Sequence, residues 1–236
     1  MIREIIPAPP LVRLPAGSFL MGETPGDKFA LDTERPAHPV EIPRPYGLGR
    51  YPVTVEEYRR FAPGFAAEEP AVWPAAGVSW DDAQAYCAWL RNESGRPYRL
   101  PAEAEWEYAC RAHSRAPFSG REEMTPAAAN FLYAEDGTRV GPGERTAVGR
   151  YPANAFGLHD LLGNVCEWVE DLWHRDYRGA PGDGSAWLQG EDSEMRTIRG
   201  GAWDYLPRLL RSTWRDSLPR GRRRDNVGFR VALTLA

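Results

Sequence analysis

Arg199-Gly200-Gly201-Ala202-Trp203 and Asn226-Val227-Gly228-Phe229-Arg230-Val231 are the two stretches that decide how the end of this chain folds. Each combines glycine, which permits close backbone approach or a positive φ, with an aromatic side chain that can anchor in a core. We therefore expect both stretches to be fixed by backbone geometry and packing. Strands are expected over residues 196–202 and 227–235, pairing with each other or with neighbouring strands.

The segment between them, residues 204–225, follows neither a helical nor a strand period. A stretch of about 20 residues without regular structure is uncommon inside a compact domain, and is usually functional or disordered. This one contains aromatic side chains, and residues 196–230 hold ten arginines against three aspartates. Such a composition argues against disorder. The pattern indicates a contact surface held on a rigid frame.

Composition and length indicate one globular domain spanning residues 1–236, because no linker or internal repeat divides the chain. An apolar content of 42%, with nine tryptophans, is enough for a core, and the net charge of -4 is modest. The N-terminus, Met1-Ile2-Arg3-Glu4, lacks an apolar signal region. No stretch reaches the roughly 20 apolar residues of a membrane span. We therefore expect a cytoplasmic protein without a membrane partner.

Three helices are expected from their N-terminal sequences. Residues 54–61 and 79–95 each open on Thr or Ser followed three residues later by an acidic residue, which is the capping-box pattern. A third helix is expected over residues 101–110. Short strands and long loops fill the rest, so the sequence predicts an α+β fold.

Short apolar runs bounded by proline and glycine predict strands at residues 11–14 and 17–22. A hairpin across Pro15-Ala16 is one way of pairing them. Further strands are expected at residues 40–42 and 165–169.

Six motifs occur in order along the chain. They are Pro15-Ala16-Gly17-Ser18-Phe19-Leu20-Met21-Gly22, Tyr51-Pro52-Val53-Thr54-Val55-Glu56-Glu57-Tyr58, Val78-Ser79-Trp80-Asp81-Asp82-Ala83, Arg99-Leu100-Pro101-Ala102-Glu103-Ala104-Glu105-Trp106-Glu107-Tyr108-Ala109, residues 154–168, and Arg199-Gly200-Gly201 with Gly228-Phe229-Arg230. This series closely resembles the formylglycine-generating enzyme (sulfatase-modifying factor) domain family and covers nearly the whole chain. The resemblance implies a C-type-lectin-like fold with many loops.

The family includes enzymes and non-enzymes, so the fold does not settle the function. The formylglycine-generating enzymes carry two reactive cysteines shortly after their Arg-Gly-Gly motif, whereas residues 203–225 contain no cysteine. Cys87, Cys110 and Cys166 have no spacing typical of a disulfide framework or a metal knuckle. A buried thiol packed as a small hydrophobe is the simplest interpretation of each. We therefore assign no catalytic residue and no redox cofactor.

A second branch of the family resembles the iron-dependent sulfoxide synthases, whose three-histidine site comes largely from an additional helical domain. The four histidines of this chain are scattered and lack paired metal-ligand spacing. They are His38, His113, His159 and His174. Each is interpreted as a surface or hydrogen-bonded histidine.

A third branch fits the closing segment better, because this segment resembles the variable region of diversity-generating retroelement proteins. In those proteins a reverse transcriptase copies a template with errors at adenines, and the copy replaces the end of the gene. The shared frame is residues 199–203, Pro207, Arg211-Ser212, Arg215, Pro219 and residues 227–230. Trp214 departs from the pattern, because adenine changes alone do not convert an asparagine codon into a tryptophan codon.

The residues between the frame positions are the candidate contact residues. They are Asp204, Tyr205, Leu206, Arg208, Leu209, Trp214, Asp216, Ser217, Leu218, Gly221, Arg223 and Arg224. Tyr, Trp and Arg dominate protein interface hot spots, which favours a protein or other macromolecular ligand. A merely solvated basic loop is the alternative interpretation. Nucleic acid is disfavoured, because the net charge is negative and no basic face extends beyond this segment.

Asp160, Gly163, Val165 and Glu167 match the calcium loop of the family. The match implies two side-chain carboxylates and two backbone carbonyls as ligands, a mixture of oxygens that calcium accepts. Calcium here would stabilise a loop-rich region. The alternative is that Glu167 caps a backbone group or pairs with an arginine.

Together these features predict a non-catalytic ligand-binding protein that displays a diversified C-terminal surface. The alternatives are a formylglycine-generating oxidoreductase acting on protein cysteine, or a structural or regulatory member of the same family.

Overall fold

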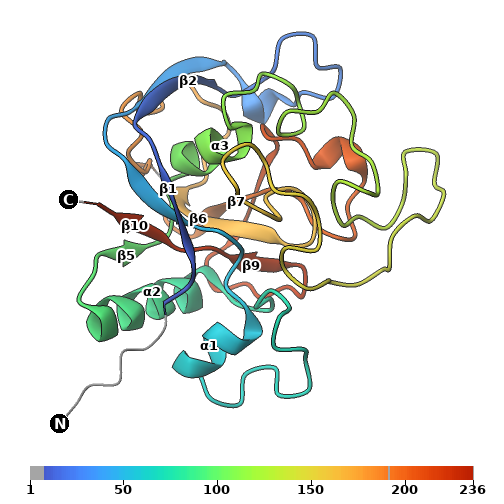
Figure 1. The fold of residues 1–236 in the computed structure, drawn as a ribbon. Helices are drawn as coiled ribbons and strands as arrows, with labels where there is room; N and C mark the ends of the chain where they lie inside the picture. Colours follow the sequence, from blue (N-terminus) through green and yellow to red (C-terminus); the bar gives the residue numbers. More distant parts are fainter. Residues whose placement is uncertain (1–7, 191, 236) are drawn as a thin grey trace.

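The computed structural model describes residues 8–190 and 192–235 and shows an α+β, C-type-lectin-like fold (Figure 1). Three α-helices and short strands are joined by long loops, and most of residues 112–165 form no regular element. The predicted fold class is confirmed.

The helices begin where the capping sequences place them. Helix α1 spans Val55–Phe61 and α2 spans Trp80–Ser94, and each has a reciprocal capping box between residues three apart. Gly95, at φ 67°, ends α2 in the left-handed conformation. Helix α3 spans Glu103–Arg111, and two 3-10 turns, η1 at Asp32–Glu34 and η2 at Pro207–Leu209, complete the helical elements of the described residues.

Two of the sheets are built from the N-terminal half and the last strand. The first sheet has four strands in the order β1 (Leu11–Leu14), β4 (Tyr46–Gly49), β10 (Ala232–Thr234), β5 (Tyr98–Arg99). A separate pair joins β2 (Gly17–Met21) to β3 (His38–Ile42). The hairpin across Pro15-Ala16 is therefore wrong, because β1 and β2 pair in different sheets.

The third sheet carries the closing segment. Its order is β8 (Arg215–Pro219), β7 (Met195–Arg199), β6 (Cys166–Leu172), β9 (Val227–Phe229), with β9 parallel to β6. The expected strand over residues 227–235 divides into β9 and β10, which belong to two different sheets. Strand β8 lies inside the stretch that was expected to be irregular, and it pairs with β7 through five residues.

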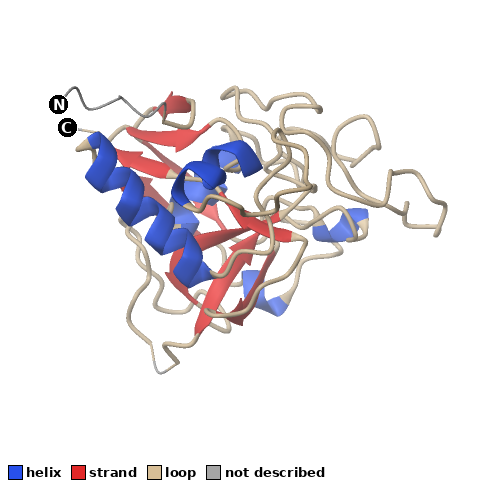
Figure 2. Cartoon of the chain, turned by 90° about the horizontal axis from the view of Figure 1, so that it is seen from below, coloured by secondary structure: helices blue, strands red, loops and turns tan. Residues whose placement is uncertain are grey.

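Two groups of buried apolar residues form the core. One lies around α3 and the loop residues Phe131 and Leu161, and the other lies between α1, α2 and the third sheet. Figure 2 shows α1 and α2 together on one side of the strands, with loops filling the opposite end. Among the described residues no helix has the length and apolarity needed to cross a membrane.

Candidate functional site

Two glycines fix the start of the closing segment. Gly200 and Gly201 have φ values of 94° and 69°, which glycine adopts without steric cost. A Cβ atom on Gly200 would lie 2.6 Å from the carbonyl oxygen of Leu161, and one on Gly201 would lie 2.9 Å from that of Leu209. Positive φ and close approach are therefore both required here, as the sequence predicts.

Buried arginine–carboxylate pairs attach the middle of the segment to distant parts of the chain. The Arg211 guanidinium donates to both oxygens of Glu34 in η1, with Nη2 at 2.6 Å from Oε1. Arg215 makes a second two-bond pair with Glu103 of α3, at 2.8 and 2.9 Å. All four side chains are at most 4% exposed. The carboxylates occupy the fork of donors that each guanidinium presents.

Two more buried pairs hold the ends of the segment. Arg199 donates to Glu107 of α3 and to the carbonyl oxygens of residues 212–214. Arg230 donates to both oxygens of Glu167, each at 2.7 Å. Five of the ten arginines in residues 196–230 are therefore buried: these four, which pair with glutamates, and Arg196, whose guanidinium lies 3.9 Å from the ring centroid of Trp80. The four paired arginines stabilise the frame rather than contact a ligand.

Two predicted contact residues are also internal, and that part of the prediction is wrong. Trp214 is 3% exposed and Leu218 is 6% exposed, because both pack into the second core group with Ile198. Tyr205 is half-buried and packs edge-on against Trp214, with ring centroids 5.4 Å apart. Almost none of the surface of Trp214 or Leu218 is therefore accessible to a ligand.

The remaining candidate contact residues are exposed or partly exposed, and we call them the C-terminal surface. They are Asp204, Tyr205, Leu206, Arg208, Leu209, Asp216, Ser217, Gly221, Arg223 and Arg224. Two of their arginines are held by exposed ion pairs, Arg208 with Glu135 and Arg223 with Asp82 at the start of α2. The Arg224 side chain has no ion-pair or hydrogen-bond partner within residues 8–190 and 192–235.

The four residues matching the family's calcium loop do not fit a cation as they lie. The Glu167 carboxylate is fully buried and already accepts from Arg230 and from Trp106 Nε1 at 2.8 Å. Asp160 Oδ2 accepts from the Gly149 amide at 2.6 Å, and burial raises the pKa of Asp160 to about 6. The arrangement matches the alternative interpretation, in which Glu167 pairs with an arginine. The calcium site stays a prediction, and the pairing of Glu167 with Arg230 disfavours it.

The three cysteines are buried, as expected. Burial raises the pKa of Cys87 and of Cys110 to about 12 and holds that of Cys166 well above the usual value. Thiolates at these positions are therefore scarce near neutral pH. Within residues 8–190 and 192–235, no group of three His, Cys, Asp or Glu side chains is placed to hold a metal ion.

Comparison with known proteins places the chain in a family. The model of the sulfatase-modifying factor enzyme 1-like domain matches residues 3–235. The chain belongs to this family. The solved structure of PvdO from Pseudomonas aeruginosa is 36% identical and superposes with a TM-score of 0.87, covering 96% of this chain and 95% of PvdO. Treponema denticola variable protein 1 is 21% identical with a TM-score of 0.77, covering 94% of each chain, which shows a shared fold.

Relatives within the sulfatase-modifying factor enzyme 1-like family include both active and inactive proteins by name. The hercynine oxygenase of Mycolicibacterium smegmatis is 30% identical over 94% of this chain and 60% of the oxygenase. The inactive C-alpha-formylglycine-generating enzyme 2 of Bos taurus is 26% identical over 94% of this chain and 87% of that protein. The chain spans 37% to 60% of the length of the first four curated relatives that it matches. Family membership alone therefore leaves catalysis open.

Sequence reasoning missed three of the four glutamate partners of the buried arginines; only the pairing of Glu167 with an arginine was considered, as the alternative to calcium. Glu34, Glu103 and Glu107 were not singled out, although the run of alternating glutamates from 103 to 107 was visible in the sequence. Buried carboxylates need partners, and a helix with three glutamates in its first turns is a signal that arginines approach it.

Proposed function

We propose that this chain is a non-catalytic ligand-binding domain whose contact site is the C-terminal surface. The observation that carries the proposal is the division of one segment into two sets of side chains. Arg211, Trp214 and Arg215 point inward and are held by ion pairs or core packing, whereas neighbours such as Asp204 and Asp216 are exposed. Exposed positions on a frame fixed by other residues tolerate substitution at little cost to folding.

The chemistry of the C-terminal surface suits a protein or other macromolecular ligand. Leu206, Leu209 and the partly exposed Tyr205 supply apolar and aromatic area, and Asp204 and Arg224 supply charges of both signs. A mixture of this kind is typical of the centre and rim of a protein interface. The resemblance of the frame to retroelement variable proteins adds that the exposed positions would be diversified.

The second candidate function is an oxidoreductase of the formylglycine-generating type. It requires a reactive thiolate, and burial raises the pKa of every cysteine. Incubation with copper and a cysteine-containing sulfatase peptide tests it directly. Turnover that disappears in Cys110→Ser or Cys166→Ser would replace the binding proposal by the catalytic one.

Two displayed libraries test the binding proposal. The first randomises Leu206, Asp216, Ser217, Gly221 and Arg224, leaving out Asp204, which accepts from the buried Asn226 amide, and Leu209, which packs against the core. The matched control randomises buried positions, namely Leu210, Ser212, Thr213 and Trp214. We expect most members of the first library to resist protease and some to bind hen egg-white lysozyme, chosen as a defined probe. We expect most members of the control library to unfold. Equal loss of folding in both libraries would show that the exposed positions are scaffold.

Diversification has its own test in the neighbouring DNA. A near-repeat of the codons for residues 199–231 that differs at adenines, beside a reverse transcriptase gene, is the expected finding. If no such repeat is present, the surface is not diversified by a retroelement and the chain is a family member with a fixed ligand or a structural role.

A further inference from the structure

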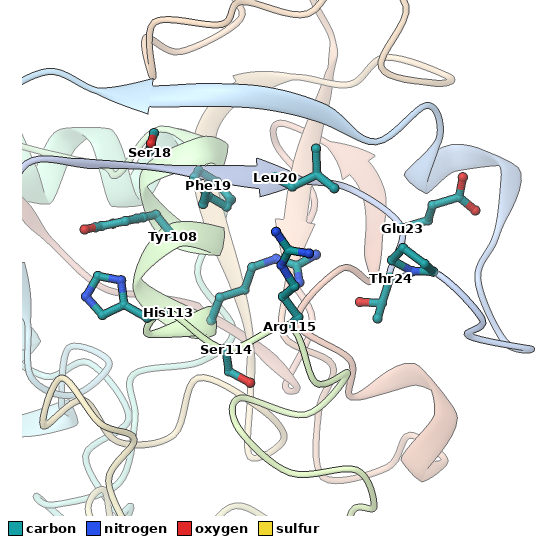
Figure 3. Close-up of a pocket in the computed structure, with 11 residues that line it drawn as sticks. Ser18, Phe19, Leu20, Glu23, Thr24, Tyr108, His113, Ser114 and Arg115 are labelled. Carbon is teal, nitrogen blue, oxygen red and sulfur yellow. The ribbon is translucent and has the colours of Figure 1, made fainter.

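A second candidate site lies away from the C-terminal surface, between β2 and the residues that follow α3. It is a cavity of about 230 Å³ lined by residues of β2, by Glu23 and Thr24, by Tyr108 and Arg111 of α3, and by residues 113–115 (Figure 3). Ligand sites usually measure roughly 300–1,000 Å³, so this cavity suits a small molecule. None of its lining residues belongs to residues 199–231.

An unusual backbone turn forms one wall of the cavity. Helix α3 ends at Arg111, and the next two residues, Ala112 and His113, have φ values of 45° and 69°. Left-handed geometry is uncommon for residues other than glycine, and two in succession are disfavoured sterically. After this turn the Arg115 side chain extends toward β2, where Figure 3 shows it beneath Leu20. Strain of this kind is often kept at ligand sites.

Guanidinium groups supply the charge of the cavity. Arg111 uses Nε for Glu107, at 2.8 Å, and Nη2 for the carbonyl oxygen of Gly22, at 2.6 Å. Nη1 of Arg111 donates no hydrogen bond to any described residue, so this nitrogen is available to a ligand. Arg115 is exposed and has no ion-pair or hydrogen-bond partner in residues 8–190 or 192–235.

The other titratable groups of the lining are Glu23, Tyr108 and His113. Glu23 pairs with Arg35, with Oε2 at 2.6 Å from Nε, and Arg35 also pairs with Asp32 at 2.7 Å. His113 packs edge-on against Phe156, with ring centroids 4.8 Å apart. Since Arg111 pairs with Glu107, Arg115 carries the unpaired positive charge that the described lining residues present to a ligand.

Two aromatic rings complete the cavity. The rings of Phe19 and Tyr108 lie 5.5 Å apart between centroids and form an apolar wall. Figure 3 shows the hydroxyl end of Tyr108 directed away from Arg115, so the ring and not the hydroxyl is the part of Tyr108 that a ligand beside Arg115 would contact.

From these groups we infer that the cavity binds a small organic carboxylate with an apolar or aromatic body. The carboxylate would accept from Arg111 Nη1 and from the Arg115 guanidinium, because a guanidinium donates short, charge-assisted hydrogen bonds to a carboxylate. The apolar body would lie against Phe19 and Tyr108. This site is separate from the C-terminal surface, so either can fail without the other.

Titration of phenylacetate into the ¹⁵N-labelled protein tests the site, with phenylacetamide as the neutral isostere. For a molecule of about ten non-hydrogen atoms we expect a dissociation constant in the millimolar range. Amide shifts should concentrate at residues 18–20 and 113–115. Phenylacetamide should bind at least about fivefold more weakly than phenylacetate, because it lacks the negative charge that the arginines recognise.

Arg115→Met removes the charge and keeps about the length of the side chain. Arg175→Met is the matched control, at another exposed arginine that has no ion-pair or hydrogen-bond partner among the described residues. We expect Arg115→Met to weaken phenylacetate about fivefold while phenylacetamide is unchanged. Arg175→Met should change neither. Equal affinity for acid and amide, shifts centred elsewhere, or no binding at millimolar concentrations would each overturn the inference.

Discussion

The Arg211–Glu34 pair offers the sharpest test of how the C-terminal segment is held. Glu34→Gln keeps the shape of the side chain and removes the negative charge, which leaves the Arg211 guanidinium buried with less compensation. Arg211 and Glu34 are both 0% exposed, and they are 177 residues apart in the sequence. The substitution therefore removes a contact between the segment and the N-terminal part of the chain without opening a cavity.

The expected loss follows from the burial of the pair. Breaking a buried ion pair by changing one partner costs about 3–5 kcal/mol, because the remaining charge is uncompensated. Asp27 lies 3.1 Å from Arg211 Nη1 and replaces part of the lost attraction, so the lower end of that range applies. With about 2–4 °C of melting temperature per kcal/mol for a chain of this size, we expect a fall of about 6–12 °C.

Thermal and urea unfolding followed by circular dichroism measure the effect. The control is Glu135→Gln, which breaks the pair of Glu135 with Arg208 in the same segment, where the side chains are 39% and 41% exposed. Exposed pairs contribute about 0–1 kcal/mol, so this variant should melt close to the wild type. Equal effects of the two substitutions would refute the distinction between frame and surface.

Three further outcomes are expected. Burial and the nearby Glu103 carboxylate raise the pKa of Asp171 to about 7. Between about pH 4 and pH 7 the folded protein therefore keeps a proton on Asp171 that the unfolded chain has released. The contribution of Asp171 to the free energy of unfolding should fall as the pH rises through this range. Urea unfolding at several pH values in that range gives the free energy of unfolding as a function of pH. This free energy should fall less steeply, or rise more steeply, with pH in Asp171→Asn than in the wild type, by up to about 1.4 kcal/mol per pH unit. Because the Glu167 carboxylate already pairs with Arg230, neither millimolar calcium nor EDTA should change the melting temperature in differential scanning fluorimetry. A rise of several degrees with calcium would show that the loop binds calcium. The three cysteines should react with Ellman's reagent at pH 8 only after guanidinium is added, and rapid reaction of the native protein would contradict their burial.

Local sequence signals predicted the helices well. The capping boxes at Thr54 and Ser79 and the left-handed Gly95 act through neighbouring residues, so their positions are readable without the tertiary structure. Strand pairing was less readable, because β1 and β2 are separated by two residues and yet join different sheets. Strand β8 was missed because its burial does not follow a period of two. Arg215 is buried in an ion pair and Leu218 in the core, with Asp216 and Ser217 more exposed between them.

The arginines of the closing segment show why the candidate site was only partly predictable. A sequence window shows that residues 196–230 are rich in arginine, but the carboxylates that neutralise four of them lie between 63 and 177 residues away. An arginine that meets a ligand and one that meets a buried glutamate look the same in the chain. The four arginines that pair with buried glutamates, Arg199, Arg211, Arg215 and Arg230, occupy positions of the shared frame. The exposed or partly exposed ones such as Arg208, Arg223 and Arg224 lie between frame positions. Position relative to the frame, not residue type, therefore separates the arginines that hold the fold from those that are free to contact a ligand.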